Sequence, residues 1–166
     1  MATIYSDVMT NMVAVPVVLN ESISNGRHMQ ALGVVTTAAD QADDTIIRMV
    51  RVPSNCRISD IKIAAADATT AGKVDVGVYY PEYNSNGGTV VDRDILAAAF
   101  DLSGGPFYYS SVLLVGVVTI AKSAQPLWQV AGLSSDPGGE LDIVMTVETL
   151  FNGGPTTIGL KVDYVV

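Results

Sequence analysis

Apolar and polar residues alternate along the segment Thr157–Val166. A period of two is typical of a β-strand that buries one of its faces. The alternation therefore predicts a strand over residues 157–166, in which the buried row consists of Ile158, Leu160, Val162, Tyr164 and Val166.

Five further segments are apolar or alternating and are bounded by Pro, Gly, Asn or Asp. They predict strands over residues 45–52, 57–64, 73–80, 112–120 and 141–148. Segments 141–148 and 157–166 are separated by the turn sequence Asn152-Gly-Gly-Pro155, so these two strands are predicted to form an antiparallel hairpin. The strand over 141–148 is expected to turn one row of side chains inward: Leu141, Ile143, Met145 and Val147.

Two segments have helical features instead. Asp92–Phe100 begins with acidic residues and is rich in helix formers at helical spacing. Ser123–Gly132 has Pro126 at a position that suits a first turn and Gly132 just beyond the expected end. We interpret Trp128, within the second segment, as a core anchor rather than a ligand-stacking residue.

The N-terminal region differs in character from the rest of the chain. Pro16 lies within the apolar run Met12–Leu19 and disfavours both a central strand and a helix interior. We predict an extended arm over residues 1–43 that contains one or two edge strands, although this region could also fold back onto its own domain. Residues 44–166 are predicted to form an all-β, jelly-roll-like sandwich with two short helices.

Charge composition narrows the class of protein. Charged residues make up 16% of the chain, against about 25% in an average protein. Such a surface is either partly covered by neighbours in an assembly or simply rich in neutral polar residues. The net charge of −8 disfavours binding to nucleic acid, which requires clustered Lys and Arg.

The sequence also argues against secretion, membrane insertion and cysteine chemistry. The N-terminus lacks the pattern of a secretory signal, and the apolar run Val112–Ala121 is about half the ~20 residues of a membrane helix. Cys56 is the sole cysteine, which excludes an internal disulfide and a zinc site made from cysteine pairs. We interpret it as a small residue with no chemical role.

Candidate catalytic and ligand-binding groups are sparse. His28 is the one histidine, and no nucleophile motif accompanies it. Acidic residues gather near Asp136, Glu140 and Asp142, but without the spacing of a calcium loop. We therefore predict no enzymatic activity, no cofactor and no metal. Six aromatic residues could line a sugar-binding face or serve as core and interface residues: Tyr79, Tyr80, Tyr83, Phe107, Tyr108 and Tyr109.

Residues 45–166 resemble small virion structural proteins of tailed bacteriophages. The resemblance rests on the Arg-Val-Pro-x-x-x-Arg-Ile-Ser pattern at Arg51–Ser59 and the Asp-x-Gly-x-Tyr strand at Asp75–Tyr79. It implies a capsid decoration, or cement, protein made in the host bacterial cytoplasm. Such a protein would bind the major capsid protein on the exterior of the virion, often as a homotrimer, and would not be an enzyme.

Two segments are the predicted contact sites of such a protein. The residues expected to touch a partner are Met12, Val13, Val15, Val17, Val18 and Leu19 of the arm, and Tyr83, Asn84 and Asn86 of a polar loop. Two other classes stay open, namely a carbohydrate-binding or host-attachment module of the virion and a depolymerase or esterase.

Overall fold

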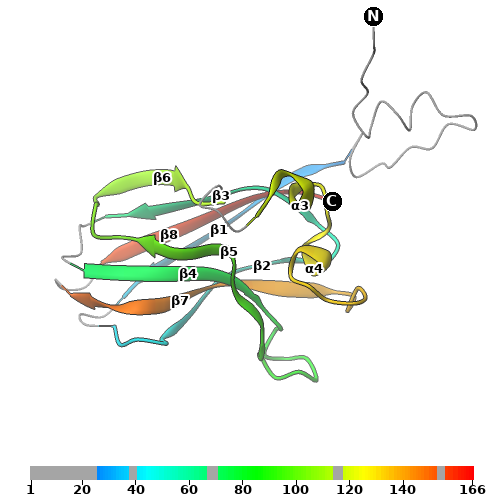
Figure 1. The fold of residues 1–166 in the computed structure, drawn as a ribbon, viewed down its shortest axis with the longest axis horizontal. Coiled ribbons are helices and arrows are strands. Elements are labelled where there is room, and N and C mark those ends of the chain that lie inside the picture. Colours follow the sequence, from blue (N-terminus) through cyan, green and yellow to red (C-terminus); the bar gives the residue numbers. More distant parts are fainter. Residues whose placement is uncertain (1–25, 38–40, 67–70, 114–117, 153–155) are drawn as a thin grey trace, which may run out of the picture.

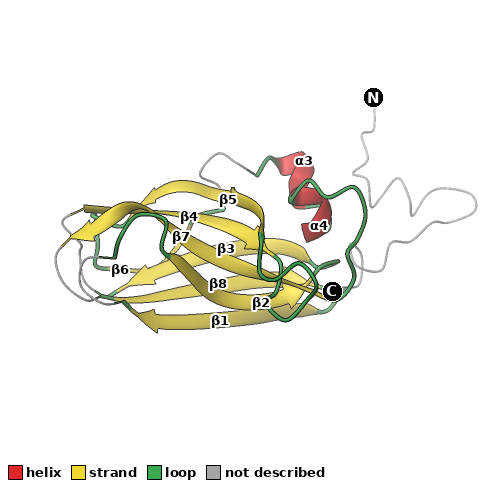
Figure 2. Cartoon of the chain, turned by 90° about the horizontal axis from the view of Figure 1, so that it is seen from below, coloured by secondary structure: helices red, strands yellow, loops and turns green. Residues whose placement is uncertain are grey.

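Two antiparallel β-sheets packed face to face make up the described part of the chain (Figures 1 and 2). The computed structural model describes residues 26–37, 41–66, 71–113, 118–152 and 156–166. Each sheet has four strands. The predicted all-β sandwich is therefore confirmed.

The strands are named here in their spatial order within each sheet. Sheet A consists of β1 (His28–Thr36), β8 (Thr157–Val165), β3 (Arg57–Ala65) and β6 (Phe107–Ser111). Sheet B consists of β2 (Ile46–Pro53), β7 (Glu140–Asn152), β4 (Ala71–Tyr79) and β5 (Val90–Asp101).

The order of the strands is that of a jelly roll. The first strand pairs with the last, the second with the seventh, the third with the sixth, and the fourth with the fifth. Apart from β4 and β5, each pair of consecutive strands is divided between the two sheets. The chain is thus folded like a long hairpin that is wrapped into a double layer, as in jelly rolls.

This wrapping shows that the predicted hairpin of 141–148 with 157–166 is wrong. β7 lies between β2 and β4 in sheet B, whereas β8 lies between β1 and β3 in sheet A. Both are central strands, so each obtains two hydrogen-bonded neighbours from segments distant in sequence. The Gly/Pro-rich connection therefore links the two sheets and does not close a hairpin.

Apart from Val166, which is 44% exposed, the inward rows predicted from the alternation form the core between the sheets. Ile158, Leu160 and Val162 of β8 have no exposed surface, and Tyr164 is 8% exposed. In β7 the predicted row is fully buried: Leu141, Ile143, Met145 and Val147. Trp128 is partly buried and packs against this core, as expected of an anchor.

The predicted helix over Asp92–Phe100 is wrong, because this segment lies within strand β5. β5 pairs with β4 through three register shifts. Val78 pairs with Asp92 and Val76 with Ala97, so β5 has more residues than β4 across the same interval. These bulges break the alternation of β5 and leave a pattern that resembles a helix.

The other predictions for the second half of the chain are partly right. β6 (Phe107–Ser111) precedes the strand predicted over 112–120, and Ile120 begins α3 (Ile120–Ser123). Residues 112–113 and 118–120 are not in a strand, and residues 114–117 of that prediction lie outside the described residues. Of the helix predicted over 123–132, only Ser123, the last residue of α3, and α4 (Leu127–Val130) are helical. Pro126 is its N-cap, and Gly132 adopts a positive φ of 78° just beyond its end. Both helices lie at one end of the sandwich, near the C-terminus (Figures 1 and 2).

Part of the predicted arm belongs to the sandwich. His28–Thr36 form β1, an edge strand that pairs with β8 along its whole length. This agrees with the alternative that the region folds back onto its own domain. An arm outside the sandwich stays a prediction for residues before 26, and its proposed contact residues lie outside the described residues: Met12, Val13, Val15, Val17, Val18 and Leu19.

Candidate functional site

The loop between β4 and β5 carries the predicted contact residues that the structure describes. It is built from consecutive turns, in which the backbone N–H of Gly87 donates to the Asn84 carbonyl oxygen at 3.0 Å. The side-chain Oδ1 of Asn84 also accepts from the backbone N–H of Asn86 at 2.9 Å, as in an Asx turn. The loop therefore has a defined conformation.

Arg48 of β2 holds both ends of this loop. Its guanidinium donates to the carbonyl oxygen of Tyr80 at 3.1 Å and to that of Gly88 at 2.8 Å. It also pairs with the Glu82 carboxylate at 3.2 Å. A Cβ at Gly88, where φ is 77°, would lie 2.6 Å from Arg48 Nη2, so only glycine suits this position.

A buried carboxylate holds Arg48 in place. Asp142 of β7 is 3% exposed and accepts from Arg48 Nη1 at 2.8 Å and from Arg51 Nε at 2.6 Å. The hydrogen bond from Arg51 to Asp142 raises the pKa of the Arg51 guanidinium. Because the two arginines share one buried carboxylate, this cluster couples β2, β7 and the loop. The acidic cluster predicted from the sequence includes Asp142, but its role as the shared partner of two arginines was not predicted.

Among the predicted contact residues that the structure describes, Tyr83 has the largest side chain. It is 67% exposed, and the Arg51 guanidinium carbon lies 4.7 Å from the centroid of its ring. Its hydroxyl donates to Glu140 Oε2 at 3.2 Å. Desolvation and this hydrogen bond raise the pKa of Tyr83. The ring is thus held in position while one side remains open to a partner, which reduces the entropy cost of binding.

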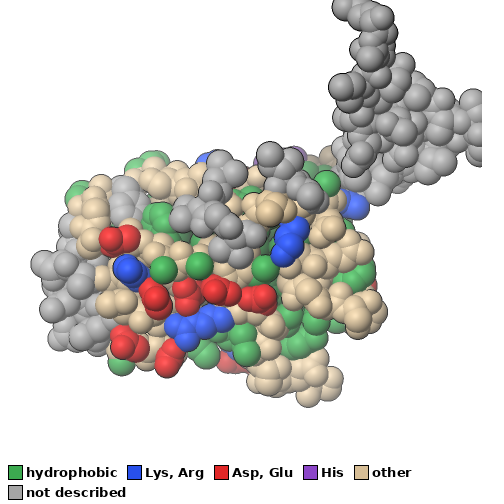
Figure 3. All heavy atoms as spheres, in the orientation of Figure 1, with side chains coloured by type: hydrophobic (Ala, Val, Ile, Leu, Met, Phe, Trp, Pro, Cys, Tyr) green, Lys and Arg blue, Asp and Glu red, His purple; other side chains and the backbone are tan. Residues whose placement is uncertain are grey.

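The face of sheet B beside the loop carries many charges. Figure 3 shows Asp and Glu side chains in a band across this face, with Lys and Arg side chains alongside. Arg93 of β5 takes part by pairing with Asp75 at 2.8 Å and with Asp44. These contacts pair carboxylates with guanidinium groups of the same chain, so we interpret the band as a network of ion pairs that stabilises the fold.

The aromatic residues of the possible sugar-binding face and the residues of the acidic cluster lie apart from one another in the structure. Tyr79 is buried in sheet B, with its hydroxyl 2.9 Å from Thr146 Oγ1, whereas Tyr108 and Tyr109 lie on β6 of sheet A. The six aromatic residues therefore form no single sugar-binding face. In the predicted acidic cluster, Asp136 accepts from Ser54 Oγ at 2.6 Å, while Glu140 and Asp142 face other partners.

Other sites of chemistry are not evident among the described residues. No group of three or more His, Cys, Asp or Glu side chains is placed to hold a metal ion in that part of the chain. Its helices include none long and apolar enough to cross a membrane. Cys56 is buried, and desolvation raises the pKa of its thiol to about 12.

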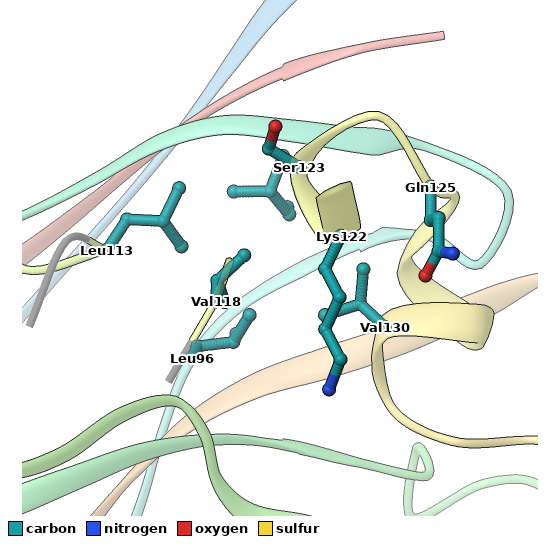
Figure 4. A pocket seen from close by; sticks show the side chains of 8 residues that line it. Leu96, Leu113, Val118, Lys122, Ser123, Gln125 and Val130 are labelled. Carbon is teal, nitrogen blue, oxygen red and sulfur yellow. The ribbon is translucent and has the colours of Figure 1, made fainter. Parts of the chain in front are cut away.

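A small cavity lies between the α3–α4 segment and the sandwich. Figure 4 shows Leu96, Leu113 and Val118 on one side of the cavity and Lys122 and Val130 on the other. Its volume is about 10 Å³, which is close to the minimum for one water molecule. It is a packing defect and does not fit a ligand.

Comparisons with solved structures reveal where this fold occurs. A chain from the capsid of Ralstonia phage GP4 superposes with a TM-score of 0.57 and 16% identity, over 84% of each chain. The fold occurs in phage capsids. A chain from the capsid asymmetric unit of cyanophage Pam1 matches with a TM-score of 0.52 and 11% identity, over 85% of this chain and 86% of that one. No family model and no curated protein sequence match the chain.

Proposed function

We propose that this chain is a structural protein of a tailed-bacteriophage virion. In this role it binds the outer surface of the head and stabilises it by bridging subunits of the major capsid protein. The observation that carries the proposal is the likeness to chains of two phage capsids, which spans over four-fifths of the chain in each comparison. Because the match extends over most of each chain, it covers the whole sandwich and not a single motif, which supports a structural role in the virion.

The charge and the loop support the exterior location. With a net charge of −8, the chain would be repelled by the packaged genome. The ordered β4–β5 loop offers Tyr83 and the neighbouring Asn84 and Asn86 as contacts for the capsid. Several weak contacts of this kind become strong when a homo-oligomer, with a trimer as the favoured state, binds several capsid subunits at once.

A co-sedimentation experiment tests this function. Purified full-length protein is mixed with phage heads assembled without it, and the bound fraction is measured against protein concentration. We expect saturable binding, followed by increased resistance of the heads to heat. A protein that stays in the supernatant at all concentrations would refute the proposal.

A loop variant tests the contact residues separately. Tyr83→Ala with Asn86→Ala should weaken binding about tenfold or more, because an exposed aromatic anchor often dominates an interface. Ser103→Ala is the matched control, since Ser103 is exposed and follows β5 at the end opposite the loop. Equal binding by both variants would remove the loop from the interface but leave the function standing.

A further inference from the structure

The outer face of sheet A contains an apolar hollow of about 190 Å³. It lies where β1 and β3 end and β8 begins. Its floor is Gly159 of β8, which pairs with Val34 of β1 on one side and Ala64 of β3 on the other. Tyr108 and Tyr109 of β6 complete the lining, and no lining residue is charged.

The local geometry explains why the face is hollow here. Gly159 has no side chain in the middle of an outward row that otherwise carries Thr157 and Lys161. A Cβ at Gly159 would lie 3.5 Å from the Tyr109 hydroxyl oxygen, an ordinary contact distance, so a Cβ fits there without overlap. Tyr109 itself has a positive φ of 52°, an unusual backbone conformation for a non-glycine residue. Such conformations gather at functional sites.

The hollow is surrounded by exposed apolar side chains. Val34 is 62% exposed and Tyr108 is 85% exposed. Leu32, two residues before Val34 on the same face of β1, is 54% exposed. The Tyr108 ring meets that of Tyr109 edge to face, with 4.7 Å between centroids. Contiguous apolar surface of this kind marks an interaction site.

The chain itself contains a segment of matching chemistry. Met12–Leu19 is uncharged and contains eight residues, seven of them Met, Val, Ala or Leu and one Pro16. A proline in an extended backbone suits a groove lined by tyrosines. A volume of 150 Å³ holds a benzene molecule, so the hollow has room for one or two aliphatic side chains.

The length of the preceding chain permits this contact. Val34 is eight residues from Gly26 along β1, a distance of about 26 Å at ~3.3 Å per residue. Met12 is fourteen residues before Gly26, a maximum span of about 48 Å. The N-terminal part of the segment, around Met12 to Val15, can therefore reach the hollow of its own subunit, whereas Leu19, seven residues before Gly26, spans at most about 25 Å.

We propose that the Met12–Leu19 segment of this chain docks its apolar side chains into the hollow between Val34, Gly159, Tyr108 and Tyr109 on sheet A. When the segment comes from a neighbouring copy, the contact links two subunits and stabilises the oligomer. This docking is separate from the proposed capsid function, because it requires no capsid and is expected in the purified protein.

Disulfide trapping in the full-length protein tests this docking. The double variant Val15→Cys with Val34→Cys is oxidised gently and separated on a non-reducing gel. We expect a cross-linked band, which migrates as a compact monomer if the segment is the subunit's own and as a dimer if it is a neighbour's. Cys56 does not compete, since its thiol is buried and protonated.

The matched control pairs Val15→Cys with Ile46→Cys. Ile46 is 51% exposed, but it lies on β2 of sheet B. Cross-linking at Val34 should exceed that at Ile46 by about tenfold, which corresponds to ~1.4 kcal/mol of preference. Equal yields for the two pairs would overturn the proposal.

Two changes at the hollow provide an independent check. Gly159→Val fills the floor with a side chain that favours strands, and Tyr108→Ala removes a wall that is too exposed to affect folding. Each should lower the cross-linking yield of the Val15/Val34 pair about fivefold or more. If both leave it unchanged, the segment does not occupy the hollow, whatever the outcome of the capsid-binding experiment.

Discussion

At the scale of single residues, Gly33 sets the distance between the two sheets at one side of the sandwich. Gly33 lies on β1, and a Cβ there would overlap the backbone carbonyl of Met49 on β2. β2 also has a register shift between Arg48 and Val50, so its backbone bulges at this point. The absence of a side chain thus permits a direct approach of one sheet's edge to the other.

Gly33→Val should therefore destabilise the protein. The added side chain meets backbone, which cannot rotate away, so we expect a loss of about 1–3 kcal/mol or more in the free energy of unfolding. Urea denaturation followed by circular dichroism measures this. Gly104→Ala is the control, because nothing lies within 4 Å of a Cβ built at Gly104. Equal midpoints for the two variants would contradict the close approach.

Asp142 matters because its buried charge balances two arginines. Asp142→Asn keeps the size of the side chain but leaves Arg48 and Arg51 without their shared carboxylate. The arginine side chains are 23% and 39% exposed, so solvent screens part of the effect, and we expect a loss of about 1–3 kcal/mol in unfolding free energy.

The same variant should loosen the β4–β5 loop that Arg48 holds. Hydrogen exchange of the loop amides would report this, and Glu148→Gln, exposed on the same strand, supplies the control. Exchange rates in Asp142→Asn that match those of the control would show that Arg48 does not need Asp142 to hold the loop.

At the scale of elements, β8 is the strand on which sheet A depends. It lies between β1 and β3 and contributes a fully buried row that includes Val162. Val162→Asp places a charge in the core with no partner, so we expect no folded protein. Val166→Asp, at a site that is 44% exposed, should fold normally. A soluble Val162→Asp variant that melts cooperatively would contradict the assignment.

The outer face of β8 carries a pH-dependent interaction across three strands. Burial of Asp163 opposes its ionisation, but the hydrogen bond from Gln30 on β1 and the charges of Lys161 and Lys62 outweigh it and lower the pKa of Asp163. A carboxyl whose pKa is lower in the folded state stabilises the fold above its unfolded-state pKa of about 4. That contribution is lost as the pH falls through the folded-state value.

Asp163→Asn should therefore be less stable than the wild type at pH 7. The difference should begin to shrink below about pH 4 and vanish once the pH is below the folded-state pKa of Asp163. Urea midpoints of both proteins at pH 7, 5 and 3 would measure the change. A difference that persists unchanged at pH 3 would mean that packing of the side chain, and not its charge, is responsible.

At the scale of the whole molecule, the two ends of the described chain meet. The backbone N–H groups of Arg27 and Val166 donate to each other's carbonyl oxygens at 3.1 Å, and β1 pairs with β8 from that point onward. Within the described residues, the sandwich is thus closed by its first and last strands.

Two deletions separate the arm from the fold. Removal of residues 2–25 should leave a cooperatively folded protein, because β1 stays intact. Removal of residues 2–40 also deletes β1, which pairs with β8 over nine residue positions, and should give an aggregated product. Size-exclusion chromatography and thermal melts compare the two. If the longer deletion folded as well as the shorter one, β1 would be dispensable.

The inward-facing rows of most strands could be predicted from the sequence alone, but not the burial of their other faces, where Asp142, Val144 and Thr146 of β7 are buried as well. The alternation in β4, β7 and β8 reflects a backbone that turns successive side chains to opposite faces, a purely local property. The turn residues likewise marked where strands end, as Pro53 does for β2. The acidic composition and the polar loop at Tyr83 led to the prediction of a binding surface. The sequence does not indicate which residues hold that loop in place.

Tertiary structure alone decided which strands are neighbours. Hydrogen bonds between strands involve the backbone, which is the same for every residue, so the pattern of β7 and β8 cannot show that they belong to different sheets. β5 became a strand because the free edge of β4 outweighed its helical propensity. The Asp142 cluster and the hollow at Gly159 arise from residues distant in sequence, and only folding brings them together.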